Sequence, residues 1–210
     1  MKRNKKLAII GAGSLGVMTL DATISQGDYA EDQIVFIDDG KKKGERLYNI
    51  PIVGGLRKIL TLDTNEYDFI IAIANNKVRK RIKSTYDNLN YVNIIHPKAV
   101  ISRFAKVGVG NIILPNVSID PNVVIKNHVI VNKNNSIGHD SVLNDFSQIS
   151  PGSNLGGFVT LEEGVFIGLG SSLLPRVRIG SFSTIGAGAV VTKDIASSIT
   201  AVGIPAKEIK

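Results

Sequence analysis

An aliphatic residue occurs at every sixth position, without interruption, from Ile95 to Val191. Helices repeat every 3.6 residues and strands every two, so neither produces this pattern. A chain that coils around a prism does, because each flat side sends one large apolar residue to the axis. The residue four places later is usually small or β-branched, as at Ser141 and Val159. We therefore predict a three-sided coil in which residues 18 apart stack at the ~4.8 Å spacing of neighbouring strands.

Composition limits the chemistry and the compartment. The chain has no cysteine, which excludes disulfides, thiolate metal sites and a cysteine nucleophile. The apolar stretch near the N-terminus ends at Gly11-Ala12-Gly13 after four residues, too short for a signal-peptide core. No segment approaches the length of a membrane span. We expect a cytoplasmic protein that does not insert into a membrane.

The net charge of +7 raises the question of a nucleic-acid partner. Basic residues form short runs at Lys2–Lys6, Lys41–Lys43 and Arg79–Lys83, and no aromatic residues interleave with them. We interpret these runs as solvated faces, or at most as places that attract phosphates. No nucleic-acid partner is expected.

The first 94 residues have a different pattern from the array. Strands are predicted at 6–10, 34–38 and 68–73, with helices at 14–25 and 77–87. Alternating strands and helices favour a small, Rossmann-like α/β domain with a parallel sheet. The predicted organisation is an α/β domain at 1–94, the repeat domain at 95–195 and a short polar tail at 196–210.

A glycine motif, Gly11-Ala12-Gly13-Ser14-Leu15-Gly16, lies between the first strand and the first helix. Such glycines let the backbone approach a phosphate at a helix N-terminus, and Asp38 and Asp39, about twenty residues on, are placed to bind sugar hydroxyls. The alternative is a tight strand–helix turn with two solvated acids. The combined context favours a nucleotide or nucleotide-sugar site. Ninety residues are too few for a complete nicotinamide enzyme, so we expect a substrate here rather than a redox cofactor.

These features together resemble a known family. The array resembles the left-handed parallel β-helix of the hexapeptide-repeat acyltransferases. The opening GAG, the Asp38-Asp39 pair, the run from Phe69 to Asn76, Ile95-His96-Pro97 and the closing segment Val202–Lys207 resemble the nucleotide-sugar acetyltransferases of the PglD and NeuD type. The resemblance covers nearly the whole chain. It implies left-handed coiling, against the usual right-handed rule, acetyl-CoA as acyl donor, and a homotrimer with CoA between neighbouring prisms.

His139 is the candidate general base. It follows the inward Ile137 by two places, so the repeat turns it outward, and the residue one full coil later is Gly157, which has no side chain to cover the imidazole. A near-neutral imidazole takes a proton from an amine or hydroxyl as that group attacks a thioester, an effect worth about 10² to 10⁴ in rate.

Asp140 is the candidate partner of that histidine, because a carboxylate holds the imidazole tautomer and raises its basicity. Neighbouring residues of a strand point to opposite faces, so the pair can meet only if the chain turns here. In the resembled family an acidic residue follows the histidine and has this role.

The other two histidines do not suggest a metal site. His96 precedes a proline and is interpreted as structural, and His128 is expected to point outward on another side of the prism. Their separations from each other and from His139 are not multiples of 18, so the three do not stack. No metal is expected.

The resemblance also implies ligand contacts. The acetyl-CoA contacts map to Gln148, Gly168, Leu169, Gly186, Ala187, Lys193 and Pro205. The sugar-nucleotide contacts map to Gly13, Ser14, Leu15, Asp38, Asp39, Gly40, Ala74 and Asn75. Gln148 replaces a histidine that we expect in similar proteins, Ser14-Leu15 replaces a Gly-His pair, and Ala74 replaces a glycine. Glycines such as Gly168 and Gly186 are also explained by the turns of the repeat.

Three functions remain open at this stage. The first is an acetyl-CoA-dependent N-acetyltransferase acting on a UDP- or dTDP-linked 4-amino-deoxy sugar in bacterial glycan and surface polysaccharide biosynthesis, by direct transfer without a covalent enzyme intermediate. The second is an O-acetyltransferase for a sugar such as sialic acid, which would not depend on a nucleotide. The third is a non-catalytic trimeric scaffold that binds sugar nucleotides and has no affinity for CoA.

Overall fold

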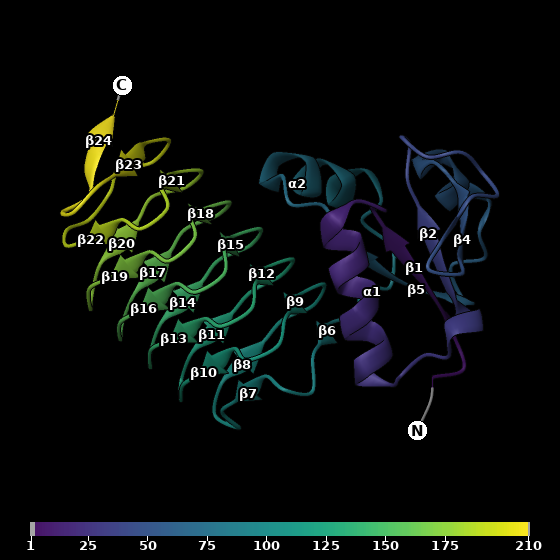
Figure 1. Ribbon diagram of the computed structural model, residues 1–210, viewed down its shortest axis with the longest axis horizontal. Coiled ribbons are helices and arrows are strands. Elements are labelled where there is room, and N and C mark those ends of the chain that lie inside the picture. The colour runs from purple at the N-terminus through teal and green to yellow at the C-terminus, as the bar shows by residue number, and fades with distance from the viewer. Residues whose placement is uncertain (1–2, 210) are drawn as a thin grey trace. The chain divides into compact units, whose positions relative to one another are not determined.

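Two compact units, Met1–Pro97 and Lys98–Lys210, make up the chain, and Figure 1 shows a mixed α/β unit and a coil of short strands. The structure is a computed structural model that describes residues 3–209. Lys2 of the first basic run and Lys210 of the predicted tail lie outside the described residues. We describe each unit by itself.

The first unit is built on a five-stranded sheet in the order β3-β4-β2-β1-β5. The strands are β1 (Lys6–Ile10), β2 (Ile34–Ile37), β3 (Arg46–Leu47), β4 (Ile50–Gly54) and β5 (Tyr67–Ile71). Strand β1 pairs in parallel with β2 and β5, β4 is parallel to β2, and β3 is antiparallel to β4. The predicted parallel α/β sheet is confirmed. Strands β3 and β4 were not predicted, because β3 is two residues long and β4 contains a proline.

Two α-helices accompany the sheet, α1 (Ser14–Gln26) and α2 (Asn76–Thr85), with 3₁₀ turns η1 (Glu31–Gln33) and η2 (Leu56–Thr61). Helix α1 ends where Gly27 adopts a left-handed conformation and donates its N–H to the Thr23 carbonyl, at 3.1 Å. The core contains fully buried strand residues such as Ile10 and Phe69, packed with Ile82 of α2. No helix among residues 3–209 is long and apolar enough to cross a membrane.

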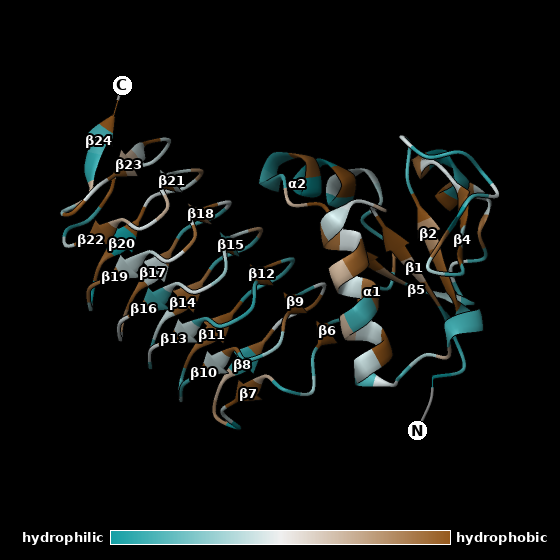
Figure 2. Cartoon of the chain, viewed as in Figure 1, coloured by the Kyte–Doolittle hydropathy of each residue, from teal (hydrophilic) through white to brown (hydrophobic). Residues whose placement is uncertain are grey.

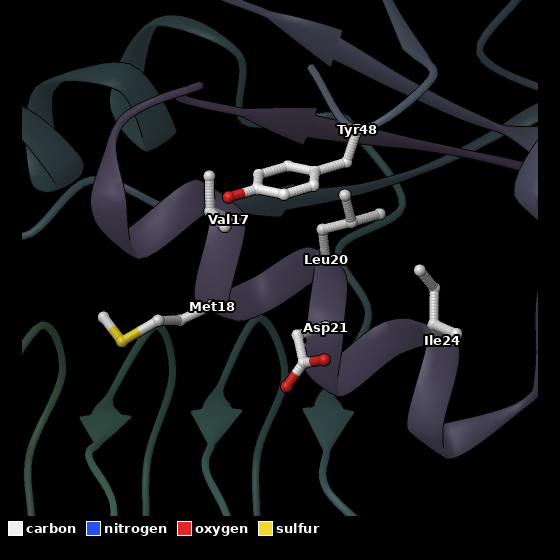
Figure 3. Close-up of a pocket in the computed structure, with 6 residues that line it drawn as sticks. All are labelled: Val17, Met18, Leu20, Asp21, Ile24 and Tyr48. Atoms are coloured by element: carbon white, nitrogen blue, oxygen red, sulfur yellow. The ribbon is translucent and has the colours of Figure 1, made fainter.

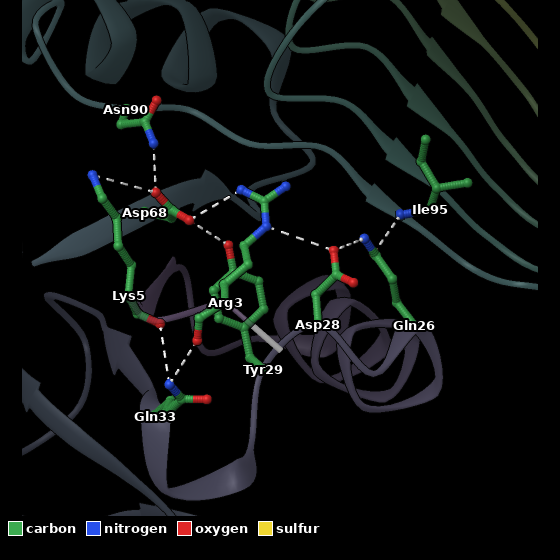
Figure 4. A network of polar contacts seen from close by, with 9 residues as sticks. All are labelled: Arg3, Lys5, Gln26, Asp28, Tyr29, Gln33, Asp68, Asn90 and Ile95. Carbon is green, nitrogen blue, oxygen red and sulfur yellow. Dashed lines mark hydrogen bonds and ion pairs between the residues drawn. The ribbon is translucent and has the colours of Figure 1, made fainter. Parts of the chain in front are cut away.

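A polar network lies at the amino ends of β1 and β5 (Figure 4). Asp68, 1% exposed, accepts hydrogen bonds from the Arg3 guanidinium at 3.1 Å and the Tyr29 hydroxyl at 2.6 Å, and Asn90 donates to its other oxygen. Burial and the bond to Asp68 raise the pKa of Tyr29, so the phenol stays neutral. The first basic run is therefore not simply a solvated face, because Arg3 also pairs with Asp28.

The second unit is a parallel β-helix of two-residue strands. The first of its three faces contains β7 (Val100–Ile101), β10 (Ser118–Ile119), β13 (Ser136–Ile137), β16 (Asn154–Leu155), β19 (Ser172–Leu173) and β22 (Val190–Val191). The second face contains β8 (Lys106–Val107), β11 (Val124–Ile125), β14 (Val142–Leu143), β17 (Thr160–Leu161) and β20 (Arg178–Ile179). The third face contains β9 (Ile112–Ile113), β12 (Ile130–Val131), β15 (Gln148–Ile149), β18 (Phe166–Ile167) and β21 (Thr184–Ile185). Strand β6 (Ile94–Ile95) precedes them in the chain, within the first unit.

The sixfold repeat forms the core of the β-helix, as predicted. Partners lie 18 residues apart, as in Ile119↔Ile137 and Ile137↔Leu155. From Ile113 to Val191 each of these aliphatic residues is at most 3% exposed, and Figure 2 shows hydrophobic and hydrophilic residues interspersed along the coils. At one corner the buried Ser153 hydroxyl donates to the Gly168 carbonyl at 2.9 Å.

The segment at 196–210, predicted as a short polar tail, contains two strands that the sequence analysis did not predict, β23 (Thr200–Val202) and β24 (Lys207–Ile209). Strand β23 is parallel to β21, and β24 folds back antiparallel on β23. Ala201 is fully buried and pairs with Ile185, 16 residues earlier. Because this last coil is two residues shorter than the others, it does not fit a period of six.

Candidate active site

His139 and Asp140 lie at the corner between β13 and β14. His139 Nδ1 is 2.8 Å from Asp140 Oδ2, and the imidazole side chain is 55% exposed. Asp140 has a φ of 58°, in the left-handed region, and its N–H donates to the Pro121 carbonyl of the preceding coil. The left-handed residue breaks the alternation of a strand, so neighbouring side chains meet. This is the turn that the sequence argument required.

A third polar residue, Asn122, completes this corner and was not predicted from the sequence. Its side-chain N–H donates to Asp140 Oδ1 at 3.1 Å. The hydrogen bond with His139, supported by the one from Asn122, lowers the pKa of Asp140. The 18-residue spacing between Asn122 and Asp140 was the available signal, since it places them on adjacent coils.

The Nε2 edge of the imidazole packs against Gly157, the glycine that the repeat places one coil later. A Cβ atom at Gly157 would lie 2.7 Å from His139 Nε2, so only glycine leaves the ring in place. Phe158 meets the imidazole edge-on, with ring centroids 5.2 Å apart. The Arg176 guanidinium lies over the other ring, 4.6 Å from the Phe158 centroid. The candidate base therefore packs against an aromatic ring that also contacts a guanidinium group.

The remaining histidines have structural surroundings. His96 is 9% exposed. His128 is 2% exposed and stacks on Phe146, with centroids 5.3 Å apart, so the prediction of an outward His128 was wrong. His128 itself has a left-handed backbone at a corner of the β-helix. Its ring packs against Gly110 of the preceding coil, where a side chain would collide with it. Among residues 3–209, no three His, Cys, Asp or Glu side chains are grouped to hold a metal ion.

The predicted CoA residues divide between two environments. Leu169 is 58% exposed, and Ala187 lies one coil further along the same corner, where the Gly188 N–H donates to the Leu169 carbonyl at 2.7 Å. Gly168 and Gly186 have a packing reason, because a Cβ would come within 2.6 Å of the Ala187 nitrogen and of Val202 Cγ1 respectively. This corner joins β18 to β19, whereas His139 lies between β13 and β14. Within one chain the two sets occupy different corners.

Three further predicted CoA contacts are scattered. Gln148 of β15 is 6% exposed, and its Oε1 atom has no hydrogen-bond partner within the described chain. Lys193 is exposed after β22, and Pro205 is exposed after a cis peptide bond. The structure does not bring these residues together with Leu169 into one cavity of the described chain.

In the glycine motif, two positions serve the fold and one is open. Gly11 has a φ of 109°, and a Cβ there would lie 2.7 Å from the Ala72 carbonyl oxygen. A Cβ at Gly16 would collide with the Gly11 carbonyl. A Cβ at Gly13, the N-cap of α1, would meet no atom within 4 Å, and no side chain caps the helix there. Ser14 beside it is exposed and Leu15 is buried, so these three residues offer mainly backbone N–H groups.

Asp38 and Asp39 follow β2 and are partly occupied by the backbone. Asp38 accepts from the N–H groups of Ala12 at 2.7 Å and Gly40 at 2.8 Å, and Asp39 accepts from the Leu56 N–H at 2.7 Å. Each ionised carboxylate has about four acceptor positions, so both retain capacity for a ligand hydroxyl. The acids thus fix the turns that surround the glycine motif.

The turn after β5 is organised by Arg79 of α2. Its guanidinium, fully buried, donates to the carbonyls of Ile73 at 2.7 Å and Ala74 at 3.1 Å. Burial lowers the pKa of Arg79 to about 9, so it remains charged at neutral pH. The solvated-face prediction was wrong for this residue. Asn75 caps α2, because its Oδ1 accepts the Val78 N–H at 3.0 Å.

The first unit also has a cavity of about 370 Å³ (Figure 3). It lies between one side of α1 and the exposed Tyr48, and its lining is Val17, Met18, Leu20, Asp21, Ile24 and Tyr48. The predicted sugar-nucleotide residues are not part of this lining.

Comparison with known proteins matches both units. Residues 6–86 match the model of the PglD N-terminal domain. GDP-perosamine N-acetyltransferase of Escherichia coli O157:H7 is 32% identical over 96% of this chain and 95% of its own length. The acetyltransferase domain of PglB from Neisseria gonorrhoeae, solved with acetyl coenzyme A, is 33% identical with a TM-score of 0.93, covering 99% and 100% of the two chains.

The chain belongs to the PglD-type sugar acetyltransferases of the hexapeptide-repeat superfamily. It is an acyltransferase, and its second unit is the left-handed parallel β-helix of that superfamily. A histidine variant of perosamine N-acetyltransferase from Caulobacter crescentus, solved with CoA and GDP-perosamine, has a TM-score of 0.92 at 27% identity and covers 100% of this chain and 99% of its own.

Proposed function

We propose that this protein transfers the acetyl group of acetyl-CoA to the amine of a nucleotide-linked 4-amino-deoxy sugar, for bacterial glycan and surface polysaccharide biosynthesis. The observation that carries the proposal is the contact between His139 Nδ1 and Asp140 Oδ2 at 2.8 Å, on an exposed corner where Gly157 makes room for the edge of the imidazole that carries Nε2. Relatives that match the whole chain are named for N-acetyl transfer to perosamine.

The reaction needs one base and no covalent enzyme intermediate. Asp140 accepts a hydrogen bond from the Nδ1–H group, which leaves Nε2 as the basic nitrogen. The sugar amine attacks the thioester carbonyl, a C–N bond forms, the amine proton passes to Nε2, and the C–S bond breaks as CoA leaves. The imidazolium then returns the proton to the CoA thiolate. Asp140 stays ionised throughout and stabilises the imidazolium.

The first unit supplies the acceptor's nucleotide site in this proposal. The open Gly13 and the uncapped start of α1, with Ser14 and Leu15, receive the diphosphate through backbone N–H groups. The remaining acceptors of Asp38 and Asp39, beside Gly40, bind hydroxyls, and the turn at Ala74 and Asn75 borders the sugar. The sequence analysis predicted a UDP- or dTDP-linked sugar, whereas one relative is named for GDP-perosamine and another was solved with it. The experiment below therefore compares all three nucleotides.

The acetyl-CoA site is proposed to lie between copies of the chain. His139 lies on one corner of the prism, and Leu169 and Ala187 lie on another, with Gly168 and Gly186 behind them. In the proposed homotrimer, the His139 corner of one chain packs against the Leu169 corner of a neighbour. The two corners then line one groove, with Lys193 and Pro205 near its end.

A panel of acceptors tests the function. Thiol release from acetyl-CoA is measured with UDP-, dTDP- and GDP-linked 4-amino sugars and with free sialic acid, and the product is examined for an amide by mass spectrometry. Turnover only with an amino sugar nucleotide supports the proposal. Acetylation of a free sugar hydroxyl without nucleotide indicates an O-acetyltransferase instead.

Thermal shifts with the same compounds separate the two sites, because a ligand that binds the native state raises the midpoint. A shift with acetyl-CoA but none with nucleotide sugars contradicts the first-unit site alone. No shift with acetyl-CoA and no turnover indicates a non-catalytic scaffold.

A further inference from the structure

The Asp140 carboxylate is held from two sides. Its Oδ2 atom contacts His139 Nδ1 at 2.8 Å, and its Oδ1 atom accepts the side-chain N–H of Asn122 at 3.1 Å. The two oxygens therefore have separate partners on separate coils of the β-helix. The Asp140 side chain is one-third exposed, so no surrounding core fixes its orientation.

The column that carries these residues is set by the backbone. Asn122 and Asp140 both have left-handed φ angles, 63° and 58°, and lie 18 residues apart. Asparagine and aspartate tolerate this conformation better than most residues. A purely conformational role for Asn122 must therefore be separated from a role in the site.

The same chain contains a matched pair without the acid or the histidine. Asn116 has a φ of 60°, and its side-chain N–H donates to Asn134 Oδ1 at 3.1 Å, also 18 residues away. Backbone conformation, bond length and spacing are nearly the same in the two pairs. Only the Asn122 pair ends on the carboxylate that contacts His139.

The terminal torsion of an aspartate is broad, so one hydrogen bond to the partly exposed imidazole does not fix the plane of its carboxylate. A second donor on a rigid neighbouring coil does. With Oδ1 anchored, Oδ2 stays directed at Nδ1, and Nε2 stays directed at the space beside Gly157. The preferred tautomer then presents its basic nitrogen to the substrate.

We infer that Asn122 is a positioning residue for acetyl transfer, which holds the Asp140 carboxylate in the orientation that keeps the His139 imidazole ready to take the amine proton. This inference rests on the proposed function of His139. Asn122 itself touches no reacting atom, and the proton passes only to His139 Nε2.

The first experiment compares Asn122→Gly with Asn116→Gly. Glycine adopts a left-handed φ without steric cost, so both variants keep the corner and lose only the amide. We expect kcat to fall about tenfold in Asn122→Gly, in the range known for partners that orient an active group, with an unchanged KM for acetyl-CoA. Asn116→Gly should keep kcat. Equal losses in the two variants would overturn the inference.

The second experiment asks whether Asn122 acts through Asp140. In an Asp140→Ala background, Asn122→Gly should cause no further loss, because the carboxylate that it orients is gone. Losses that multiply, as for independent sites, would contradict the inference. Asn122→Asp, which suits the same backbone but cannot donate, should be at least as slow as Asn122→Gly; full activity would contradict it too.

A measurement without substrate separates this inference from the proposed function. The chain has three histidines, and ¹⁵N-labelled imidazole signals of His139 can be assigned by comparison with His139→Ala. Asn122→Gly should change the Nδ1/Nε2 tautomer ratio of His139, and Asn116→Gly should not. An unchanged ratio overturns the inference. If the tautomer ratio of His139 changes as expected but the protein acetylates no amino sugar, the positioning role of Asn122 is supported and the proposed reaction is rejected.

Discussion

The corner that carries His139 repeats the backbone of its neighbours, because a left-handed residue occurs at every sixth position from Gly110 to Gly188 and hydrogen bonds join the corner to the coils on either side. The turns around Gly13 in the first unit have no such repeat. They are fixed by individual side chains, with Asp38 bonded to the Ala12 N–H and Arg79 bonded to the Ala74 carbonyl. One site thus inherits its geometry from the scaffold, and the other depends on a few polar contacts.

This difference determines what a substitution removes. In the β-helix, a functional side chain can be exchanged while neighbouring coils preserve the backbone. In the first unit, polar side chains hold the loops in place through hydrogen bonds to the loop backbone. A substitution of such a side chain is therefore expected to alter both stability and ligand binding. The following changes test that contrast.

The largest expected effect is the loss of turnover in His139→Ala. Removing the base should lower kcat by about 10² to 10⁴. The imidazole is more than half exposed, so the unfolding midpoint and the oligomer size should be preserved. Steady-state kinetics and calorimetry measure both, with Ser136→Ala, an exposed residue of the same coil, as control. A His139→Ala variant with most of its activity would rule out this base.

Arg79→Met should show the opposite profile. The carbonyls of Ile73 and Ala74 lose their buried donor, at a cost of about 2 kcal/mol in unfolding free energy. The turn at Ala74 and Asn75 loosens with it, so the KM for the nucleotide sugar should rise while that for acetyl-CoA stays constant. Arg81→Met, exposed on the same helix, is the control. Unchanged stability in Arg79→Met would show that other groups hold the turn.

The β-helix was predictable because its period of six is visible in the sequence itself. The aliphatic residues at that period are the side chains that enter the core. It also specified that His139 faces outward near Gly157. The shortened coil that buries Ala201 does not obey the period and was missed. The His139–Asp140 contact was uncertain for a related reason, since strand alternation does not include the left-handed corner residue that unites them.

The first unit was predicted less completely. Apolar runs identified β1, β2 and β5, and the glycine motif identified the strand–helix turn. The burial of Arg79 was not visible, because its place in a basic run resembles a solvated helix face and only tertiary contacts show its carbonyl partners. Likewise, the sequence does not distinguish a glycine needed for packing from one that faces open space.

Gly157→Ala tests how closely the repeat fits the histidine. The added methyl would lie 2.7 Å from His139 Nε2, so the imidazole must move. A misplacement of about 1 Å costs up to about 10²-fold in rate, so kcat should fall by a factor between about 10 and 100. In Gly170→Ala, the Cβ has open space, and turnover should be kept despite the strain of its left-handed φ. Equal kcat values in the two variants would contradict a tight fit.

The smallest expected effect separates the two roles of glycine in the first motif. Gly13→Ala places a methyl in open space at the start of α1, so its unfolding free energy should change by about 1 kcal/mol or less. The methyl occupies the approach of the diphosphate, and the KM for the nucleotide sugar should rise. In Gly16→Ala the methyl collides with the Gly11 carbonyl, so the free energy of unfolding should fall even in the absence of ligand. Calorimetry and nucleotide-sugar titration distinguish them. If Gly13→Ala binds normally, the motif is only a tight turn, and the contrast between the two units applies to folding alone.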